Sequence, residues 1–219
     1  LDPQLVSTHR FALIEASPRL TAIQKKTLEE AQAKPAWFSR VEDLPDGPLF
    51  IVGNELFDAV PIKEYVKTPA GWRERVVGHT DDGALAFGIG PGALEPSLLP
   101  KDAEQAPEGT IFETAPAREA LMDVIAERLS RQLGAGLFID YGYSDPALGD
   151  TLQAVRRHAY DDPLAHPGEA DLTAHVDFAA LGSVARTHGL ETRLMPQGEF
   201  LLGLGLLERA GRLGAGKSA

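Results

Sequence analysis

Three short apolar runs in this chain are each followed closely by an acidic side chain or an amide. The runs and the residues that follow them are Phe11 to Ile14 with Glu15, Leu49 to Val52 with Asn54 and Glu55, and Leu137 to Ile139 with Asp140. Apolar runs without polar alternation are typical of strands covered on both faces in a parallel sheet. Because ligands bind at the carboxyl ends of such strands, the pattern predicts an α/β fold with polar groups at one rim of its sheet.

Helical patterns alternate with these runs. Ser17 and Pro18 form an N-cap followed by proline at the first helical position, and Leu20 and Ile23 begin an apolar face. We expect that face to pack against the fold and the helix to end before Pro35. Two further helices are expected, one from Pro116 to about Leu133 and one from Phe178 with Gly189 beyond its end.

A different pattern between the second and third runs indicates an antiparallel insertion. From Ile62 to Phe87, short β-like pieces are separated by Pro69-Ala70-Gly71 and Asp81-Asp82-Gly83 turns. The following Gly88-Ile89-Gly90-Pro91-Gly92 imitates a phosphate-binding loop, but Pro96 and Pro100 prevent a helix from opening there, so we expect a turn. The predicted organisation is a first part of the core over residues 1–61, a β-rich insertion and loop over 62–110, and the remainder of the core over 111–219.

The last third of the chain is expected to close the sheet. The acid-rich and histidine-containing stretch from Ser144 to Thr173 is expected to be a loop. Leu194-Met195 and Phe200-Leu201-Leu202 indicate antiparallel strands, followed by a short helix from Glu208 to Leu213. The predicted fold class is therefore α/β, a sheet with helices on both faces, antiparallel C-terminal strands and a β-rich insertion.

Charge and cysteine content exclude several classes of function. The 21 basic and 32 acidic side chains give a net charge of −11, which argues against nucleic acid, since that affinity rests on clustered Lys and Arg. Cysteine is absent, which rules out disulfides and cysteine nucleophiles and fits a reducing compartment. The run from Leu201 to Leu207 is far shorter than the roughly 20 apolar residues of a membrane span. The chain opens Leu1-Asp2-Pro3-Gln4 without an initiator methionine or signal segment, and we expect a fragment.

The strand ends supply the candidate site residues. Glu15 follows the first strand, where an acid commonly accepts hydrogen bonds from ribose hydroxyls, although a solvated acid near the helix N-terminus fits equally well. Asn54, Glu55 and Asp58 place an amide and two carboxylates within five residues of sequence. Charges at the end of an apolar strand must be paired, hydrated or shifted in pKa. A binding site and simple turn capping by Asn54 and Asp58 are both consistent with this cluster.

Residues near the third run were also considered for metal binding and for a substrate pocket. The candidate metal ligands are His158, His166, Asp171, His175 and Asp177. No His-x-x-x-His or Glu-x-x-x-His pair lies on a predicted helix, so we predict no metal site and expect Asp177 to cap a helix. His175 could instead line a substrate channel. Tyr141 and Tyr143 either wall a pocket, which we favour, or pack against the rim of the sheet.

Four blocks of the sequence resemble, in order, successive blocks of one protein family. The blocks are Phe11 to Leu20, Asn54 to Pro61, Phe138 to Tyr143 and Gly168 to Phe178. They are similar to the MidA family, whose members resemble the mitochondrial complex I assembly-factor methyltransferase. The resemblance runs from Phe11 to about Arg209 and implies a Rossmann-like class I S-adenosylmethionine-dependent methyltransferase that acts on protein arginine. The glycine-rich cofactor loop of that family has no counterpart here, which implies that an N-terminal part of the fold is missing.

The resemblance places Glu15 at the ribose of the cofactor, and Asn54 and Glu55 at the end of the fourth strand next to the methyl group. Together with the residue patterns above, this predicts seven site residues: Glu15 and Asn54 at the cofactor, Glu55 and Asp58 at the catalytic centre, and Asp140, Tyr141 and His175 at the substrate. A guanidinium has a pKa above about 12 and is a poor nucleophile, so it must be held with one nitrogen toward the methyl group. A bidentate contact from Glu55 would orient it, and Asp58 would pair with it or receive the proton.

The same resemblance implies S-adenosyl-L-methionine as cofactor and a partner protein with a basic arginine target. It implies a cytoplasmic location for a bacterial-type chain and a mitochondrial one for eukaryotic relatives, and it leaves the oligomeric state open. One alternative is a non-catalytic binding or assembly module that retains the fold. A nicotinamide-dependent oxidoreductase ranks last, because it would need the glycine loop that this chain lacks.

Overall fold

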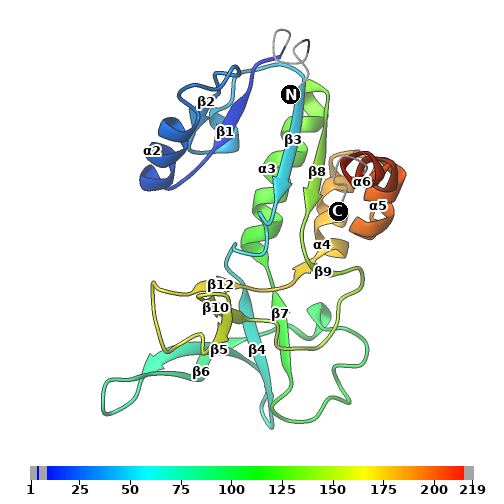
Figure 1. The fold of residues 1–219 in the computed structure, drawn as a ribbon. Coiled ribbons are helices and arrows are strands. Elements are labelled where there is room, and N and C mark those ends of the chain that lie inside the picture. Colours follow the sequence, from blue (N-terminus) through cyan, green and yellow to red (C-terminus); the bar gives the residue numbers. More distant parts are fainter. Residues whose placement is uncertain (1–3, 5–8, 215–219) are drawn as a thin grey trace.

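The computed structural model describes residue 4 and residues 9–214 and divides into three regions (Figure 1). An N-terminal unit contains β1 (Ala12–Ile14), α2 (Pro18–Thr27) and β2 (Ala36–Phe38). A central region contains β3 (Leu49–Asn54), α3 (Pro116–Gln132), β8 (Gly134–Ile139) and α4 (Phe178–Thr187). An antiparallel sheet contains β4 (Lys63–Thr68), β5 (Gly71–His79), β6 (Leu85–Ala93) and β7 (Ile111–Thr114). Two short 3₁₀ helices lie at Val41–Asp43 and Pro96–Leu98.

The N-terminal unit is a parallel strand pair joined by a helix. β1 and β2 pair in parallel, with Leu13 opposite Trp37. The predicted cap of α2 is confirmed, because the Ser17 hydroxyl accepts a hydrogen bond from the Leu20 amide at 3.3 Å. The predicted packed face is wrong for the described part of the chain, where α2 has no buried residue and Leu20 is 47% exposed. No described element covers this face of α2, so its apolar side chains have nothing to pack against.

The central region contains the larger of two hydrophobic cores. β3 and β8 pair in parallel over six residues each, and Leu49 and Ile51 of β3 pack into the core beneath α3 and α4. The buried members of this core are Val41, Leu44, Phe57, Met122, Ile125, Ala126, Leu129, Val176, Leu181 and Ala185. The predictions of α3 and α4 are confirmed, including the Asp177 cap, whose carboxylate accepts from the Ala180 amide at 2.9 Å.

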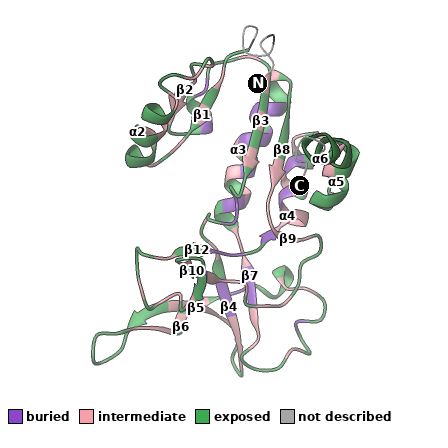
Figure 2. Ribbon diagram, viewed as in Figure 1, coloured by how far each residue is buried: buried purple, intermediate pink, exposed green. Residues whose placement is uncertain are grey.

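The opposite face of this strand pair is open. Phe50 and Val52, which alternate with the core residues of β3, are 75% and 70% exposed (Figure 2). Within the described residues, β1 has β2 as its only sheet neighbour and β3 has β8. The structure therefore places helices against one face of the β3–β8 pair, whereas the sequence predicted helices on both.

The predicted antiparallel insertion is confirmed, with strand order β6-β5-β4-β7. Gly71 and Gly83 form its turns with φ angles of +95° and +84°, which glycine adopts without strain. The predicted turn at residues 88–92 is wrong, because these residues lie in β6. β6 lies at the edge of this sheet, where a proline such as Pro91 is tolerated because an edge strand can lack one hydrogen-bond donor. A Cβ added at Gly90 would lie 2.7 Å from Val76 Cγ1. The glycines thus permit close packing against β5.

Three short strands lie within the segment from Ser144 to Thr173 that was expected to be a loop. They are β10 (Gln153–Arg156), β11 (Ala159–Asp161) and β12 (Asp171–Thr173), and β9 (Gly142–Tyr143) and β13 (Val176–Asp177) flank the segment. β10 pairs antiparallel with β11 and β12, and β13 pairs in parallel with β9. The loop prediction is wrong here because tertiary pairing orders strands that are too short and too polar to give an apolar pattern.

The predicted C-terminal strands are also wrong. The segment forms α5 (Gln197–Gly203) and α6 (Leu206–Gly214), and Phe200-Leu201-Leu202 lies inside α5. A short apolar run fits strand and helix equally well, and here Pro196 stands at the N-cap, where its fixed φ leads into the helix. The expected helix from Glu208 to Leu213 is confirmed within α6. None of the helices in the described ranges is long and apolar enough to cross a membrane.

Candidate active site at the strand ends

The carboxyl ends of β3 and β8 lie side by side and present Glu55 and Asp140. Asn54 is opposite Ile139 in the strand pair, and the Glu55 amide donates to the Ile139 carbonyl at 2.8 Å. Glu55 has a φ of 50°, an uncommon backbone conformation for a residue other than glycine. Its side chain is exposed and makes no hydrogen bond or ion pair within the described residues. A carboxylate thus stands free at the end of a strand in the centre of the fold.

Asp140 orders the loop that follows β3. One carboxylate oxygen, Oδ2, accepts from the amides of Phe57 and Asp58 at 3.0 and 3.2 Å, and Oδ1 accepts from the Tyr141 amide at 2.9 Å. Burial and then the charge of Asp58 raise the pKa of Asp140, while the three amides oppose that rise. Asp140 therefore has a clear positioning role, and its predicted contact with substrate stays a prediction.

Asp58, Tyr141 and His175 form a contiguous group beside this loop. Asp58 is 5% exposed, and its Oδ2 accepts from the Tyr141 hydroxyl at 2.7 Å. Its other oxygen, Oδ1, is buried without a hydrogen-bond partner in the described structure. The Tyr141 and His175 rings meet edge to face with centroids 5.6 Å apart. Burial raises the pKa of Tyr141. Thr173 and Gln153 oppose this rise, and the hydrogen bond to Asp58 and the Asp58 charge add to it.

Arg118 holds the backbone around the same group by hydrogen bonds, and the sequence did not point to it. The side chain is 1% exposed and lies on the core face of α3. Its guanidinium donates to the carbonyls of Val60, His175, Asp58 and Ala174 at 3.2, 2.6, 2.9 and 3.0 Å. The signal was present, because residue 118 precedes Met122, Ile125 and Leu129 at helical spacing on one buried face.

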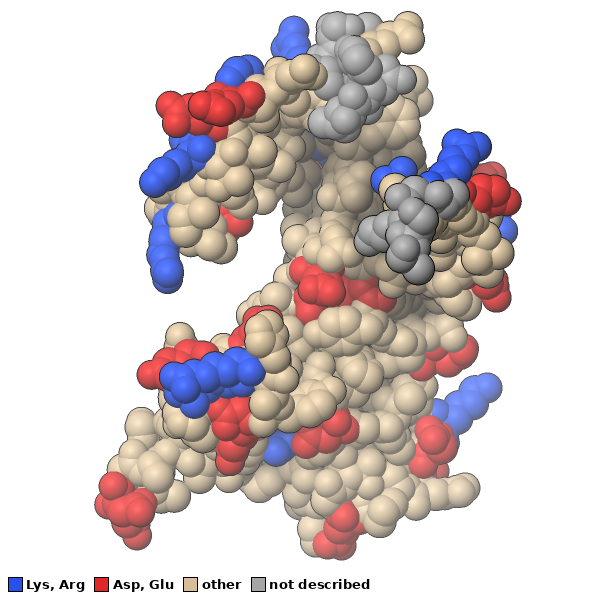
Figure 3. All heavy atoms as spheres, in the orientation of Figure 1, with Lys and Arg blue, Asp and Glu red and all other residues tan. Residues whose placement is uncertain are grey.

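Glu15 lies apart from these residues, at the end of β1. Its carboxylate accepts from the Ser17 amide at 2.9 Å and from the Gln24 side chain at 3.1 Å. It borders a cavity of about 360 Å³ that Lys25 and Ser39 also line. The molecule is hollowed between the N-terminal unit and the antiparallel sheet, and acidic side chains lie along that hollow (Figure 3). The structure thus joins Asn54, Glu55, Asp58, Asp140, Tyr141 and His175 through contacts, and gives Glu15 a separate position.

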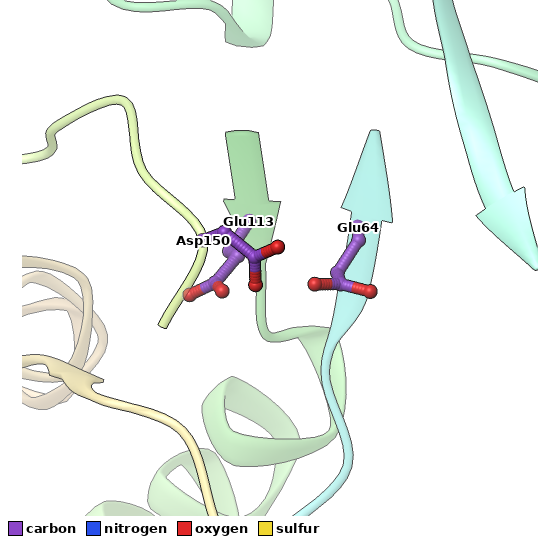
Figure 4. Close-up of side chains that lie close together, drawn as sticks. All are labelled: Glu64, Glu113 and Asp150. Atoms are coloured by element: carbon purple, nitrogen blue, oxygen red, sulfur yellow. The ribbon is translucent and has the colours of Figure 1, made fainter. Parts of the chain in front are cut away.

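A second acidic group lies in the antiparallel sheet (Figure 4). Glu64, Glu113 and Asp150 bring carboxylate oxygens within 4.8 Å of one another. Arg75 already pairs with Glu64 at 3.2 Å and Asp150 at 2.7 Å, and Glu113 accepts two hydrogen bonds from Thr151. Burial, opposed by Arg75 and assisted by the neighbouring acids, raises the pKa of Glu64 to about 7. Sequence spacing gave no sign of this group, whose members come from three distant segments.

The fold and the strand-end site define an α/β protein that holds acidic groups at the rim of a parallel strand pair. The model of a family of S-adenosyl-L-methionine-dependent methyltransferases matches residues 1–195. The chain belongs to this methyltransferase family.

Curated relatives and solved structures agree with this assignment. The chain is 32% identical to the Caenorhabditis elegans mitochondrial homolog of the protein arginine methyltransferase NDUFAF7, over 81% of this chain and 42% of that protein. It is 30% identical to the human mitochondrial protein arginine methyltransferase NDUFAF7, over 92% of this chain and 49% of that protein. The chain spans about half the length of these relatives.

A solved structure from Burkholderia thailandensis extends the likeness to the fold. This likely methyl transferase of the COG1565 superfamily, bound to S-adenosyl-homocysteine, is 29% identical with a TM-score of 0.65. The match covers 82% of this chain and 48% of that one. Another member from the same organism gives a TM-score of 0.67 at 29% identity, over 82% of this chain and 50% of that one.

Proposed function

We propose that the protein transfers a methyl group from S-adenosyl-L-methionine to an arginine side chain of another protein. The observation that carries this proposal is the free Glu55 carboxylate at the end of β3, on the same loop as the buried Asp58, which accepts from Tyr141. The relatives are protein arginine methyltransferases, and they supply the substrate class. The link to complex I assembly, from the resemblance, belongs to the same proposal.

The chemistry fits the arrangement of these side chains. The sulfonium of the cofactor supplies an electrophilic methyl group, so the protein chiefly has to position the nucleophile. Glu55 is free to form a bidentate contact with a guanidinium, which would fix the orientation of its nitrogens. Asp58 has one oxygen bonded to Tyr141 and one without a partner in the described structure, so it can take a hydrogen bond or a proton. His175 and Tyr141 would form one wall of the substrate path.

The cofactor would lie between β1 and β3. Glu15 retains lone pairs beyond its two local hydrogen bonds and borders a cavity, which fits a contact with ribose hydroxyls. We further propose that β1 and β3 belong to one Rossmann-like sheet completed by polypeptide outside these 219 residues. Their unpaired edges and the exposed Phe50 and Val52 support this, since parallel sheets are normally covered on both faces. A reducing, cytoplasmic compartment fits the absence of cysteine.

A charge-removing variant tests the role of Glu55. Methyl transfer from labelled S-adenosyl-L-methionine to a basic protein substrate is measured with the full-length gene product and its Glu55→Gln and Glu191→Gln variants. We expect Glu55→Gln to lower kcat by about 100-fold or more, because it loses the charged fork while keeping its shape. Glu191→Gln removes an exposed carboxylate elsewhere and should leave kcat unchanged.

Calorimetry separates the enzyme from a non-catalytic module. We expect the full-length protein to bind S-adenosyl-L-methionine, and Glu15→Gln to weaken that binding. An absence of cofactor binding would favour the assembly module over the enzyme. Normal turnover by Glu55→Gln would remove Glu55 from the mechanism.

A further inference from the structure

A cavity of about 470 Å³ lies beside the strand-end site, and its lining includes His175 and Tyr143, which the sequence suggested as a pocket wall. The antiparallel sheet and the first turns of α3 and α4 enclose it. One side of its wall is apolar and contains Tyr65, Leu94, Phe112 and Leu181. Such a wall can cover the methylene stem of a long side chain. Cavities of this kind, apolar with a few converging polar groups, are typical ligand sites.

Several polar groups of the lining have no partner in the described structure. The Tyr143 hydroxyl, the Glu119 carboxylate and the ring of His175 border the cavity, and no hydrogen bond from these side chains to a described residue is present. The two basic side chains of the lining already have partners. Arg118 donates to four backbone carbonyls, and Lys63 pairs with Glu74 at 2.9 Å. Of the free groups, the Glu119 carboxylate can only accept, and the Tyr143 hydroxyl and the His175 ring can each accept as well as donate.

Acidic side chains outnumber basic ones in the lining of the cavity. Glu113, Glu119 and Asp177 stand against Lys63 and Arg118. Burial and then the charge of Asp177 raise the pKa of Glu119. Burial, followed by Asp177 and Glu113, raises the pKa of Tyr143 to about 12. Each acid would be stabilised in its charged form by a cation placed among them.

We propose that this cavity binds a second lysine or arginine side chain of the protein substrate, one that flanks the methylated arginine. This inference rests on the proposed function for the identity of the partner. The flanking residue is distinct from the methyl acceptor, because neither Glu55 nor Asp58 lines the cavity. His175 borders the cavity and touches Tyr141, so the two subsites would be neighbours on one substrate path. The protein would then select basic sequences rather than isolated arginines.

Nuclear magnetic resonance titration of the full-length protein without the cofactor tests binding without turnover. The probes are a blocked Gly-Arg-Gly peptide, the same peptide with neutral citrulline, and free L-arginine. We expect the arginine peptide to shift the amide signals of Tyr143, His175 and Leu181, and citrulline to leave them in place. Free arginine should bind more weakly than the blocked peptide, because the acidic side chains of the lining would repel its α-carboxylate. Tighter binding of free arginine would identify an amino-acid site and overturn the docking role.

Matched variants locate the charge. Glu119→Gln should lower the affinity for the arginine peptide by roughly fivefold, which is the effect of losing one partly exposed ion pair. Glu127→Gln, on the outer face of α3, should leave that affinity unchanged. In methyl transfer by the full-length protein, Glu119→Gln should raise KM about fivefold for a substrate with flanking basic residues and leave kcat unchanged. Equal binding by both variants, or a loss of kcat alone, would overturn the inference. If methyl transfer is absent while the peptide still binds, the proposed function fails and not the cation site.

Discussion

Replacing Arg118 tests whether one buried cation holds the site together. Its four hydrogen bonds connect the loop after β3, at Asp58 and Val60, to the segment before β13, at Ala174 and His175. Hydrogen bonds to a charged group contribute about 1.5–3 kcal/mol each, but burying the guanidinium costs several kcal/mol. The Asp58 carbonyl keeps a second donor, the Ala174 amide at 3.1 Å. The other three carbonyls would lose the donor that Arg118 supplies.

An unpaired buried acceptor costs about 1–3 kcal/mol, and water entering the gap would relieve part of that cost. We therefore expect Arg118→Met to lower the free energy of unfolding by about 3–5 kcal/mol. Arg118→Lys should lose less, because an ammonium can still reach one or two of the carbonyls. Urea unfolding followed by tryptophan fluorescence measures both variants. Arg131→Met, on the exposed face of the same helix, should change stability by less than about 0.5 kcal/mol.

Amide hydrogen exchange gives the local result. The Ala174 amide donates to Asp58 and the Val176 amide donates to Tyr141, so both should lose protection in Arg118→Met before the rest of α3 does. This role of Arg118 is refuted if Arg118→Met unfolds within about 1 kcal/mol of the wild type with unchanged exchange at these two amides.

Two further perturbations address the antiparallel sheet and the β9–β13 pair. The pKa of Glu64 is raised from 4.5 to about 7 in the fold, so its neutral form is favoured and stability should fall as pH rises between these values. Glu64→Gln should flatten that fall, which is about 2 kcal/mol between pH 5 and pH 7.5, when urea unfolding is compared at these two values. Parallel changes in both proteins would contradict this role of Glu64. Gly142→Ala should cost at least about 2 kcal/mol in thermal unfolding, because its Cβ would lie 2.0 Å from the Val176 carbonyl oxygen. Gly149→Ala, with no atom within 4 Å of the added Cβ, is the control and should be near neutral.

Elements with strong local signals could be predicted from the sequence. α2 begins at a serine followed by proline, α3 begins at Pro116 and gives way to β8 at Gly134, and α4 begins after Asp177. In each case side chains within one turn of the boundary satisfy or remove the free amides of the helix end. The strand ends were also visible, because an apolar run followed by a carboxylate needs no long-range information.

Elements that depend on distant partners could not be predicted. Residues 88–92 became part of a strand because β5 lies beside them, and at Gly90 and Gly92 side chains of β5 fill the space that a Cβ would need. The short strands β10 to β12 exist only through their mutual pairing. The Glu64, Glu113 and Asp150 group required three segments to meet, and no spacing along the chain reports such a meeting.

The arrangement around Asp58 supports the role proposed for Glu55. The Asp58 amide donates to the Asp140 carboxylate, its carbonyl accepts from Arg118, and its own carboxylate accepts from Tyr141. The half-buried Asp140 carboxylate thus accepts from amides of this loop, and the buried Arg118 guanidinium donates to its carbonyls, so a shift of the backbone would leave some of these groups without partners. Glu55 lies three residues before Asp58 on the same loop. Its amide donates to the Ile139 carbonyl, and its carboxylate is exposed. The fixed backbone limits the positions that this carboxylate can reach, and such preorganisation would favour the guanidinium contact proposed for Glu55.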